Sequence, residues 1–86
     1  MQNNPFYYGL PSGIQLEVLD NNRLGIRKVI KSRIILKNAT KIIEIARQIK
    51  SRHPELEITL ICTRNICSKS IALLVKERIE IVYFDK

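Results

Sequence analysis

Two hydrophobic patterns follow one another in residues 38–62, NATKIIEIARQIKSRHPELEITLIC. In the first part, apolar residues recur at helical spacing, and they are Ala39, Ile42, Ile43, Ala46 and Ile49. Asn38 stands where an N-cap is expected, and Pro54 disfavours the α region for the residue before it, so we expect a helix over 38–51. Residues 56–62 are nearly continuous apolar sequence, which predicts a strand covered on both faces.

The same order of helix and strand recurs after residue 62. Residues 68–78 predict a second helix with Ser68 as its N-cap, and we expect Ile71, Leu74 and Val75 to face inward. Residues 79–84, IEIVYF, predict a last buried strand.

Two further segments precede residue 38. Residues 14–20 alternate apolar and polar side chains, which predicts a strand, and Asp20-Asn21-Asn22 supplies a hairpin turn tolerant of positive φ. In residues 23–37 the alternation predicts a strand, bent or broken near Ser32, with a cationic outer face. An amphipathic helix using Ile26, Val29, Ile30 and Ile34 is the alternative, and the enrichment in β-branched residues favours strand.

The expected order of elements is therefore β-β-α-β-α-β. Strands that alternate with helices predict crossover connections, hence an α/β fold with a mainly parallel sheet flanked by helices and one antiparallel hairpin strand. The chain of 86 residues is long enough for one small domain, which we place at 14–86. Residues 1–13 form an irregular arm, whose rings at Phe6, Tyr7 and Tyr8 cover an edge of the core or stack on bases or on a second subunit.

Composition narrows the class of protein. The apolar runs are far shorter than the ~20 residues that cross a membrane, and residues 1–13 carry no charge and no signal-type block, so we expect a soluble, cytoplasmic protein without a membrane partner. The short chain is compatible with a homodimer, and its abundant Ile, Lys, Arg and Glu favour a heat-adapted source. Two cysteines and one histidine lack the spacing of a zinc site, so we expect reduced thiols, with no metal and no cofactor.

Charge placement gives the clearest functional signal. Between Asp20 and Glu44 there is no acidic residue, and the net charge of +7 equals the seven basic residues of this stretch, Arg23, Arg27, Lys28, Lys31, Arg33, Lys37 and Lys41. If residues 23–37 are one strand, five of them share a face, namely Arg23, Arg27, Lys31, Arg33 and Lys37. Such a stripe can follow the phosphates of DNA or RNA, although a solvated face that prevents edge pairing gives the same pattern.

Residues 63–70 occupy the carboxyl end of a predicted parallel strand and lead into a helix. Ligands gather at this end of α/β sheets, and Arg64 and Lys69 are candidates there for additional phosphate contacts. The segment contains no Gly, so it is not a glycine-rich phosphate loop. We expect Cys62 to be a core thiol without a catalytic role, and His53 to be a surface residue.

Glu17 and Asp20 lie on or just after the first predicted strand, and Lys31 lies on the next. With residues 38–85, this arrangement resembles the restriction-endonuclease-like nucleases, in which an acid on one strand and an acid-x-Lys tripeptide on its neighbour hold a divalent metal. The resemblance implies catalytic roles for Glu17, Asp20 and Lys31, with Mg²⁺ as the cofactor. Val29 stands where the second acid belongs and cannot ligate Mg²⁺, so the resemblance implies a degenerate copy that binds without cutting.

Residues 66–74 and 79–85 are also similar to the amino-terminal domain of the CRISPR integrase, but the helix over 38–51 does not suit that mostly β domain. The sequence as a whole predicts a small basic protein that binds nucleic acid without catalysis. The alternatives are a metal-dependent nuclease and a protein-interaction or assembly module.

Overall fold

The elements follow the predicted order. The computed structural model describes residues 2–84, so residue 1 of the expected arm and residues 85 and 86 of the expected domain lie outside the described part. The elements are η1 (Pro5–Tyr8), β1 (Gln15–Asp20), β2 (Arg23–Lys28), α1 (Leu36–Arg52), β3 (Glu57–Cys62), α2 (Ser68–Lys76) and β4 (Glu80–Tyr83). The predicted α/β class and the order β-β-α-β-α-β are confirmed.

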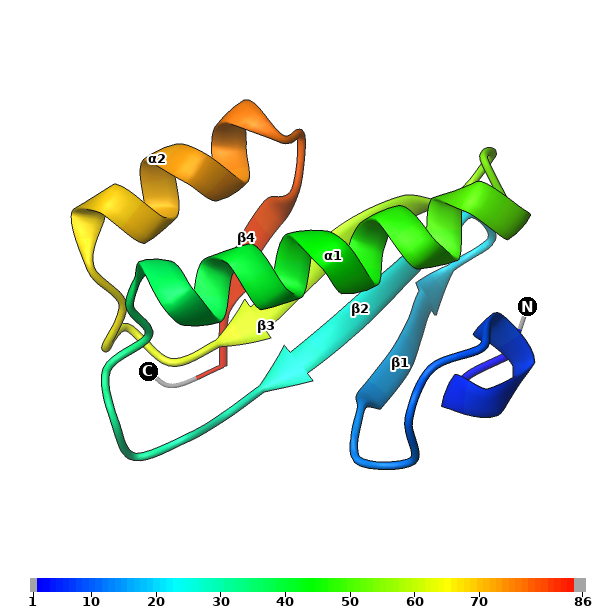
Figure 1. Cartoon of the computed structure of the whole chain (residues 1–86), viewed down its shortest axis with the longest axis horizontal. Helices are drawn as coiled ribbons and strands as arrows, with labels where there is room; N and C mark the ends of the chain where they lie inside the picture. The colour runs from blue at the N-terminus through cyan, green and yellow to red at the C-terminus, as the bar shows by residue number, and fades with distance from the viewer. Residues whose placement is uncertain (1, 85–86) are drawn as a thin grey trace.

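The four strands lie in the sheet in the order in which they occur along the chain, β1-β2-β3-β4. β1 is antiparallel to β2, whereas β2, β3 and β4 are parallel, as the sequence predicted. Both crossovers step in the same direction across the sheet and crossovers of this kind are right-handed, so α1 and α2 lie on one face (Figure 1). The other face carries no helix from residues 2–84.

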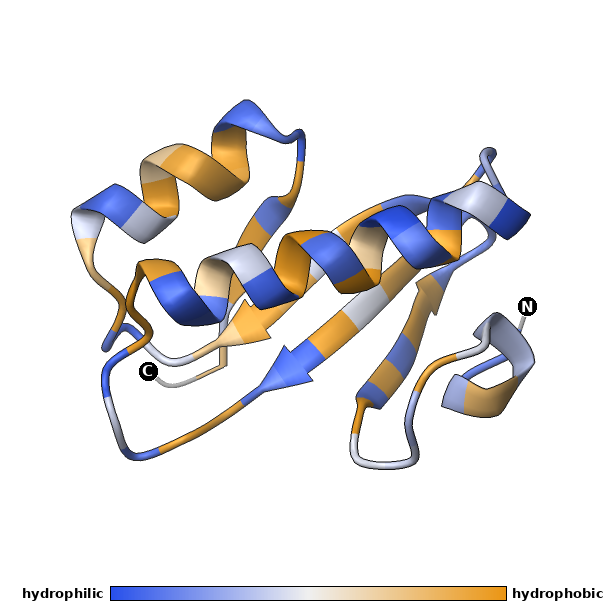
Figure 2. Ribbon diagram, viewed as in Figure 1, coloured by the Kyte–Doolittle hydropathy of each residue, from blue (hydrophilic) through white to orange (hydrophobic). Residues whose placement is uncertain are grey.

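The predicted helix over 38–51 is confirmed, but α1 begins at Leu36. Asn38 is therefore not the N-cap; it lies in the first turn, where its Oδ1 accepts the N–H of Ile35 at 3.0 Å. Polar and apolar residues alternate along α1, as expected of an amphipathic helix (Figure 2). The apolar residues Ala39, Ile42, Ile43, Ile45, Ala46 and Ile49 are buried against the sheet and α2.

The prediction of a strand over 23–37 was wrong beyond Lys28. The last pair that β2 forms with β3 is Lys28 with Cys62, and the chain then leaves the sheet to reach the helix layer. Only Ile34 returns to a single bridge, with Ile66. On this connection, the side chain of Ile34 is buried and that of Ile30 is half-buried. The alternation of apolar and polar residues therefore continues beyond the end of the strand.

The second half of the chain differs from the prediction at three points. The N-cap of α2 is Cys67 rather than Ser68, and its Sγ accepts the N–H of Ser70 at 3.4 Å. Val75 is exposed, and Ser70 is buried with Leu74. β4 is an edge strand whose outer residue Val82 is exposed, because a strand at the edge has a neighbour on one side only.

The hairpin between β1 and β2 closes without positive φ, which among the described residues occurs only at Gly9 and Arg78. Instead, Asp20 Oδ1 accepts the N–H of Asn22 at 3.2 Å. Asp20 can therefore shape the turn through its side chain, as Asx turns do.

The arm covers one end of the core. Tyr8 is buried, and its carbonyl accepts a hydrogen bond from Gln48 Nε2 at 3.1 Å, which ties the arm to α1. His53 is half-buried rather than a plain surface residue, since its ring stacks on that of Tyr7 with centroids 5.3 Å apart. Phe6 remains exposed.

Candidate nucleic-acid interface

Most of the acidic residues and most of the basic stretch lie at opposite ends of the parallel strands. Five carboxylates are at the edge where the parallel strands begin, namely Asp20, Glu55, Glu57, Glu77 and Glu80. The other edge, where β2, β3 and β4 end, is formed by the connections 29–35 and 63–67. Neither connection contains an acidic residue, and nor do the whole stretches 24–43 and 58–76. We call the end of the sheet at which β2, β3 and β4 terminate the carboxyl edge. It is distinct from the two edge strands, β1 and β4.

The predicted single stripe is divided in the structure. Arg23 and Arg27 lie on the helix-free face and are neutralised there. Arg23 reaches Glu80 at 3.0 Å and both Asp20 and Glu57 at 3.8 Å. Arg27 pairs with Glu17 at 3.4 Å. The prediction that five basic residues share one strand face was therefore wrong. Only Arg23 and Arg27 lie together on a face of β2, and both are ion-paired.

Lys31 and Arg33 lie on the connection from β2 to α1 at the carboxyl edge, where both are exposed. Hydrogen bonds hold this connection against the one that follows β3. Ile34 N–H donates to Asn65 O at 2.9 Å, and Cys67 N–H donates to Ile34 O at 3.0 Å. Asn65 Nδ2 also donates to Lys31 O at 3.3 Å.

These bonds bring two segments that are distant in sequence into one surface. Arg64 and Lys69, the predicted additional contacts, are exposed on the second of these segments. The structure therefore places them at the same edge as Lys31 and Arg33. Both helices also begin here, so the positive ends of their dipoles add to the positive charge of the edge.

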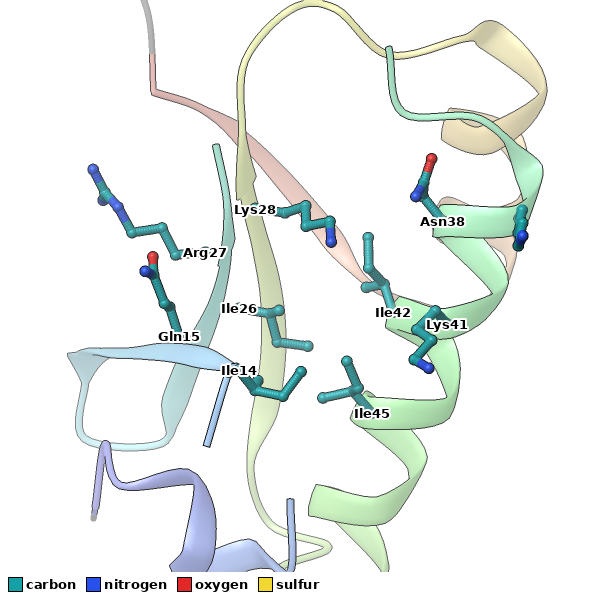
Figure 3. A pocket seen from close by; sticks show the side chains of 11 residues that line it. Ile14, Gln15, Ile26, Arg27, Lys28, Asn38, Lys41, Ile42 and Ile45 are labelled. Carbon is teal, nitrogen blue, oxygen red and sulfur yellow. The ribbon is translucent and has the colours of Figure 1, made fainter. Parts of the chain in front are cut away.

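Lys28, Lys37 and Lys41 line a groove between the β1–β2 hairpin and α1. Lys28 extends from β2 towards the helix, whereas Arg27 also lines the groove but extends its side chain to the other side of the strand (Figure 3). Lys37 and Lys41 are exposed on α1, one helical turn apart. Among residues 2–84, no ion pair involves any of these three lysines.

Two arginines at the carboxyl edge lie over aromatic rings of β4 and of the residue that follows it. Arg27 Cζ is 4.3 Å from the ring centroid of Phe84, and Arg64 Cζ is 4.7 Å from that of Tyr83. Phe84 is exposed, so part of its ring remains accessible to solvent. Contacts of this kind hold the guanidinium groups in fixed orientations.

Cys67 and Cys62 have different environments, and neither is joined in a disulfide. Cys62 is buried, which confirms its predicted place in the core. Hydrogen bonding from Ser70, whose Oγ lies 2.9 Å from the sulfur, lowers the pKa of the Cys67 thiol, and the positive charge of Arg33 lowers it further. A cysteine at the N-cap was not anticipated from the sequence, because cysteine is not among the usual N-cap residues.

The residues expected to form a nuclease site do not converge. Glu17, in the middle of β1, pairs with Arg27 near the end of β2, and Asp20 lies at the edge where β2 begins. Lys31 was expected on the second strand but lies beyond the end of it, at the opposite edge of the sheet. No three His, Cys, Asp or Glu side chains in the described ranges gather closely enough to hold a metal ion.

The sequence prediction gave little weight to the second acid-free stretch. Residues 58–76 carry Arg64, Lys69 and Lys76 without any carboxylate. In each of these two acid-free stretches, which run from a strand into the following helix, the cations that follow the strand directly lie at the carboxyl edge, whereas Lys76 lies at the far end of α2. The repeated absence of acidic residues in the sequence could have predicted that the basic surface extends beyond residues 23–41.

No family model, curated protein or solved structure matches the chain significantly. Neither of the helices within residues 2–84 is both long enough and apolar enough to cross a membrane.

Proposed function

We propose that the protein binds nucleic acid along the carboxyl edge without cleaving it. The surface consists of seven residues, Lys28, Lys31, Arg33, Lys37, Lys41, Arg64 and Lys69. The observation that carries this proposal is the separation of charge, since the described carboxylates lie at the opposite edge or in the middle of β1 and α1. Arg23 and Arg27 are left out of the surface because carboxylates already neutralise them.

A surface of this composition favours phosphates. Exposed lysines and arginines release the counterions that surround a phosphate backbone, and this release gives an affinity that falls as salt rises. Two helices begin at this edge, and the positive ends of their dipoles favour anions. Lys31, Arg33 and Arg64 lie on two connections that hydrogen bonds hold together, and the other four cations lie on β2, α1 and α2.

Titration of the protein with labelled single-stranded and duplex oligonucleotides at about 50 and 200 mM salt tests the proposal. If about four phosphates are neutralised, the affinity should fall about 50-fold for the single strand and about 150-fold for the duplex. Binding that is absent at the lower salt, or that does not respond to salt, would reject a surface driven by phosphate contacts.

Charge reversal locates the surface. The double variant Lys37→Glu/Lys41→Glu should reduce affinity on the order of tenfold or more and lower the salt slope by about two. Both positions are exposed near the start of α1, where acidic residues suit the helix dipole, so we expect the variant to fold. The control Lys50→Glu/Lys76→Glu changes the net charge equally at the opposite edge. An equal loss in the control would contradict the placement.

One observation favours the assembly module as a second candidate. Val29, Ile35 and Leu36 are exposed beside the cations of the same connection, with exposed fractions of 41%, 50% and 44%. A second chain would bury them. Sedimentation that shows a stable dimer, together with no oligonucleotide binding at low salt, would favour this candidate over nucleic-acid binding.

A further inference from the structure

The groove beside α1 has an apolar floor within the basic surface. It has a volume of about 200 Å³. Ile14 and Ile26 line it from the hairpin, and Ile42 and Ile45 line it from the helix. In Figure 3 these four side chains converge between β2 and α1. A group that enters the groove therefore meets a hydrocarbon surface.

The rim of the groove is cationic. Lys28 and Lys41 extend from opposite walls, one from β2 and one from α1 (Figure 3). No described residue that lines the groove is acidic. Two ammonium groups on either side of an apolar hollow attract an anion, so the matching ligand joins a negative group to an apolar one.

Asn38 adds a directed polar group at the rim. Its Oδ1 is held by the N–H of Ile35 at 3.0 Å, which fixes the orientation of the carboxamide. Its amide nitrogen consequently points to the side of the groove from which Lys28 extends (Figure 3). The N–H donors of this amide suit a carbonyl oxygen or a ring nitrogen, both of which nucleobases carry.

We propose that the groove takes one unpaired base of the bound strand, with the neighbouring phosphate held between Lys28 and Lys41. This inference rests on the proposed function. A groove of about 200 Å³ is smaller than the sites of roughly 300 to 1,000 Å³ that enclose drug-sized ligands, so it accepts one base and not a longer segment. A base within a duplex must first be unstacked and unpaired, and the protein therefore prefers single strands.

A comparison of two single strands tests the inference directly. The first has an ordinary sequence, and the second has the same length and phosphates but only abasic sites. The ordinary strand should bind about tenfold more tightly, because an interacting base contributes to affinity where a bare sugar does not. Equal affinities would overturn the inference, and a small anionic amphiphile such as octanoate would become the ligand to test. The proposed phosphate surface would stand in that case, whereas failure of both strands to bind would overturn both proposals.

Gly13→Phe adds a bulky side chain at a residue that lines the groove, without changing a charge. Gly13 lines the groove, a Cβ built there meets nothing within 4 Å, and its φ is not positive, so a side chain is tolerated. The variant should bind the ordinary strand as weakly as the abasic strand, and its affinity for the abasic strand should not change. Ser12→Phe, an exposed neighbour outside the groove, is the matched control. An undiminished preference for the ordinary strand in Gly13→Phe would contradict the assignment.

Discussion

The two faces of β2 carry three residues each and differ in what covers them. Leu24, Ile26 and Lys28 face α1, where the first two are buried and the third reaches the groove. Arg23, Gly25 and Arg27 lie on the helix-free face, among carboxylates and aromatic rings. The location of a cation relative to carboxylates therefore decides whether it is available to a ligand.

On the helix-free face, side chains of the sheet cover one another in place of a helix. A Cβ at Gly25 would lie 2.7 Å from Ile61 Cδ1 and 3.3 Å from Leu19 Cδ1. The glycine thus lets Ile61 lie over β2, and Ile61 is buried although no described helix covers it. Around it, the ion pairs of Arg23 and Arg27 stay partly exposed and contribute little free energy each.

Leu24→Ala should give the largest effect of the changes that probe these two faces. Leu24 is fully buried between β2 and the helix layer, so the variant should lower the free energy of unfolding by about 2–5 kcal/mol. Val82→Ala, at an exposed edge-strand position, should change it by roughly 0.5 kcal/mol or less. Urea unfolding measures both variants. Similar losses would mean that burial under the helices does not dominate stability.

Alkylation of the two cysteines tests whether Arg33, which follows β2, keeps its charge available to its surroundings, because that charge lowers the pKa of Cys67. Native protein should react with iodoacetamide at Cys67, at a lower pH than an ordinary thiol, because hydrogen bonding from Ser70 and the charge of Arg33 lower its pKa. Cys62 should react only after unfolding, since it is buried. Mass spectrometry identifies the modified residue.

The same reaction separates the two kinds of cation. Ser70→Ala should move the pH profile of Cys67 upward, and Arg33→Gln should move it in the same direction. Arg27→Gln should leave it unchanged, because Arg27 is paired with Glu17. A profile that responds to Arg27 and not to Arg33 would contradict the difference drawn between the faces.

Arg23→Gln/Arg27→Gln should have the smallest effect on binding. These arginines belong to the basic stretch of the sequence but not to the proposed surface, so affinity for an oligonucleotide should change by about twofold or less. The variant removes as much positive charge as a Lys37→Gln/Lys41→Gln variant, which serves as the comparison. Fluorescence anisotropy titrations measure the affinity of both variants for the same oligonucleotide. A greater loss of affinity in the arginine variant would indicate that the binding site lies on the helix-free face.

The order of elements could be predicted because each helix and most strands have a clear hydrophobic period. The strong amphipathic pattern that includes Ile42, Ala46 and Ile49 defined α1, and the apolar run ending at Cys62 defined β3. The end of β2 could not be predicted in this way. β2 ends where its pairing with β3 ends, at Lys28 and Cys62. Ile34, on the connection that follows, is buried, so the sequence keeps alternating apolar and polar residues beyond the end of the strand.

The candidate site was predicted only in part for a related reason. A sequence pattern shows that Arg23 is basic, but its partners Glu57 and Glu80 belong to other strands and become neighbours only through the sheet register. The groove likewise needs Lys28 and Lys41 on different elements. What the sequence did contain was the absence of carboxylates from residues 24–43 and 58–76.

The agreement between strand order in the sheet and strand order along the chain bears on how the protein folds. Each strand pairs with the one formed just before it, so every loop that must close during folding spans only one connection. The parallel pairs nevertheless join residues far apart in sequence, such as Arg23 and Glu57, so we expect them to form more slowly than the hairpin. The hairpin can serve as a template to which the two later strand-and-helix units add in turn, without any strand having to insert between two already paired.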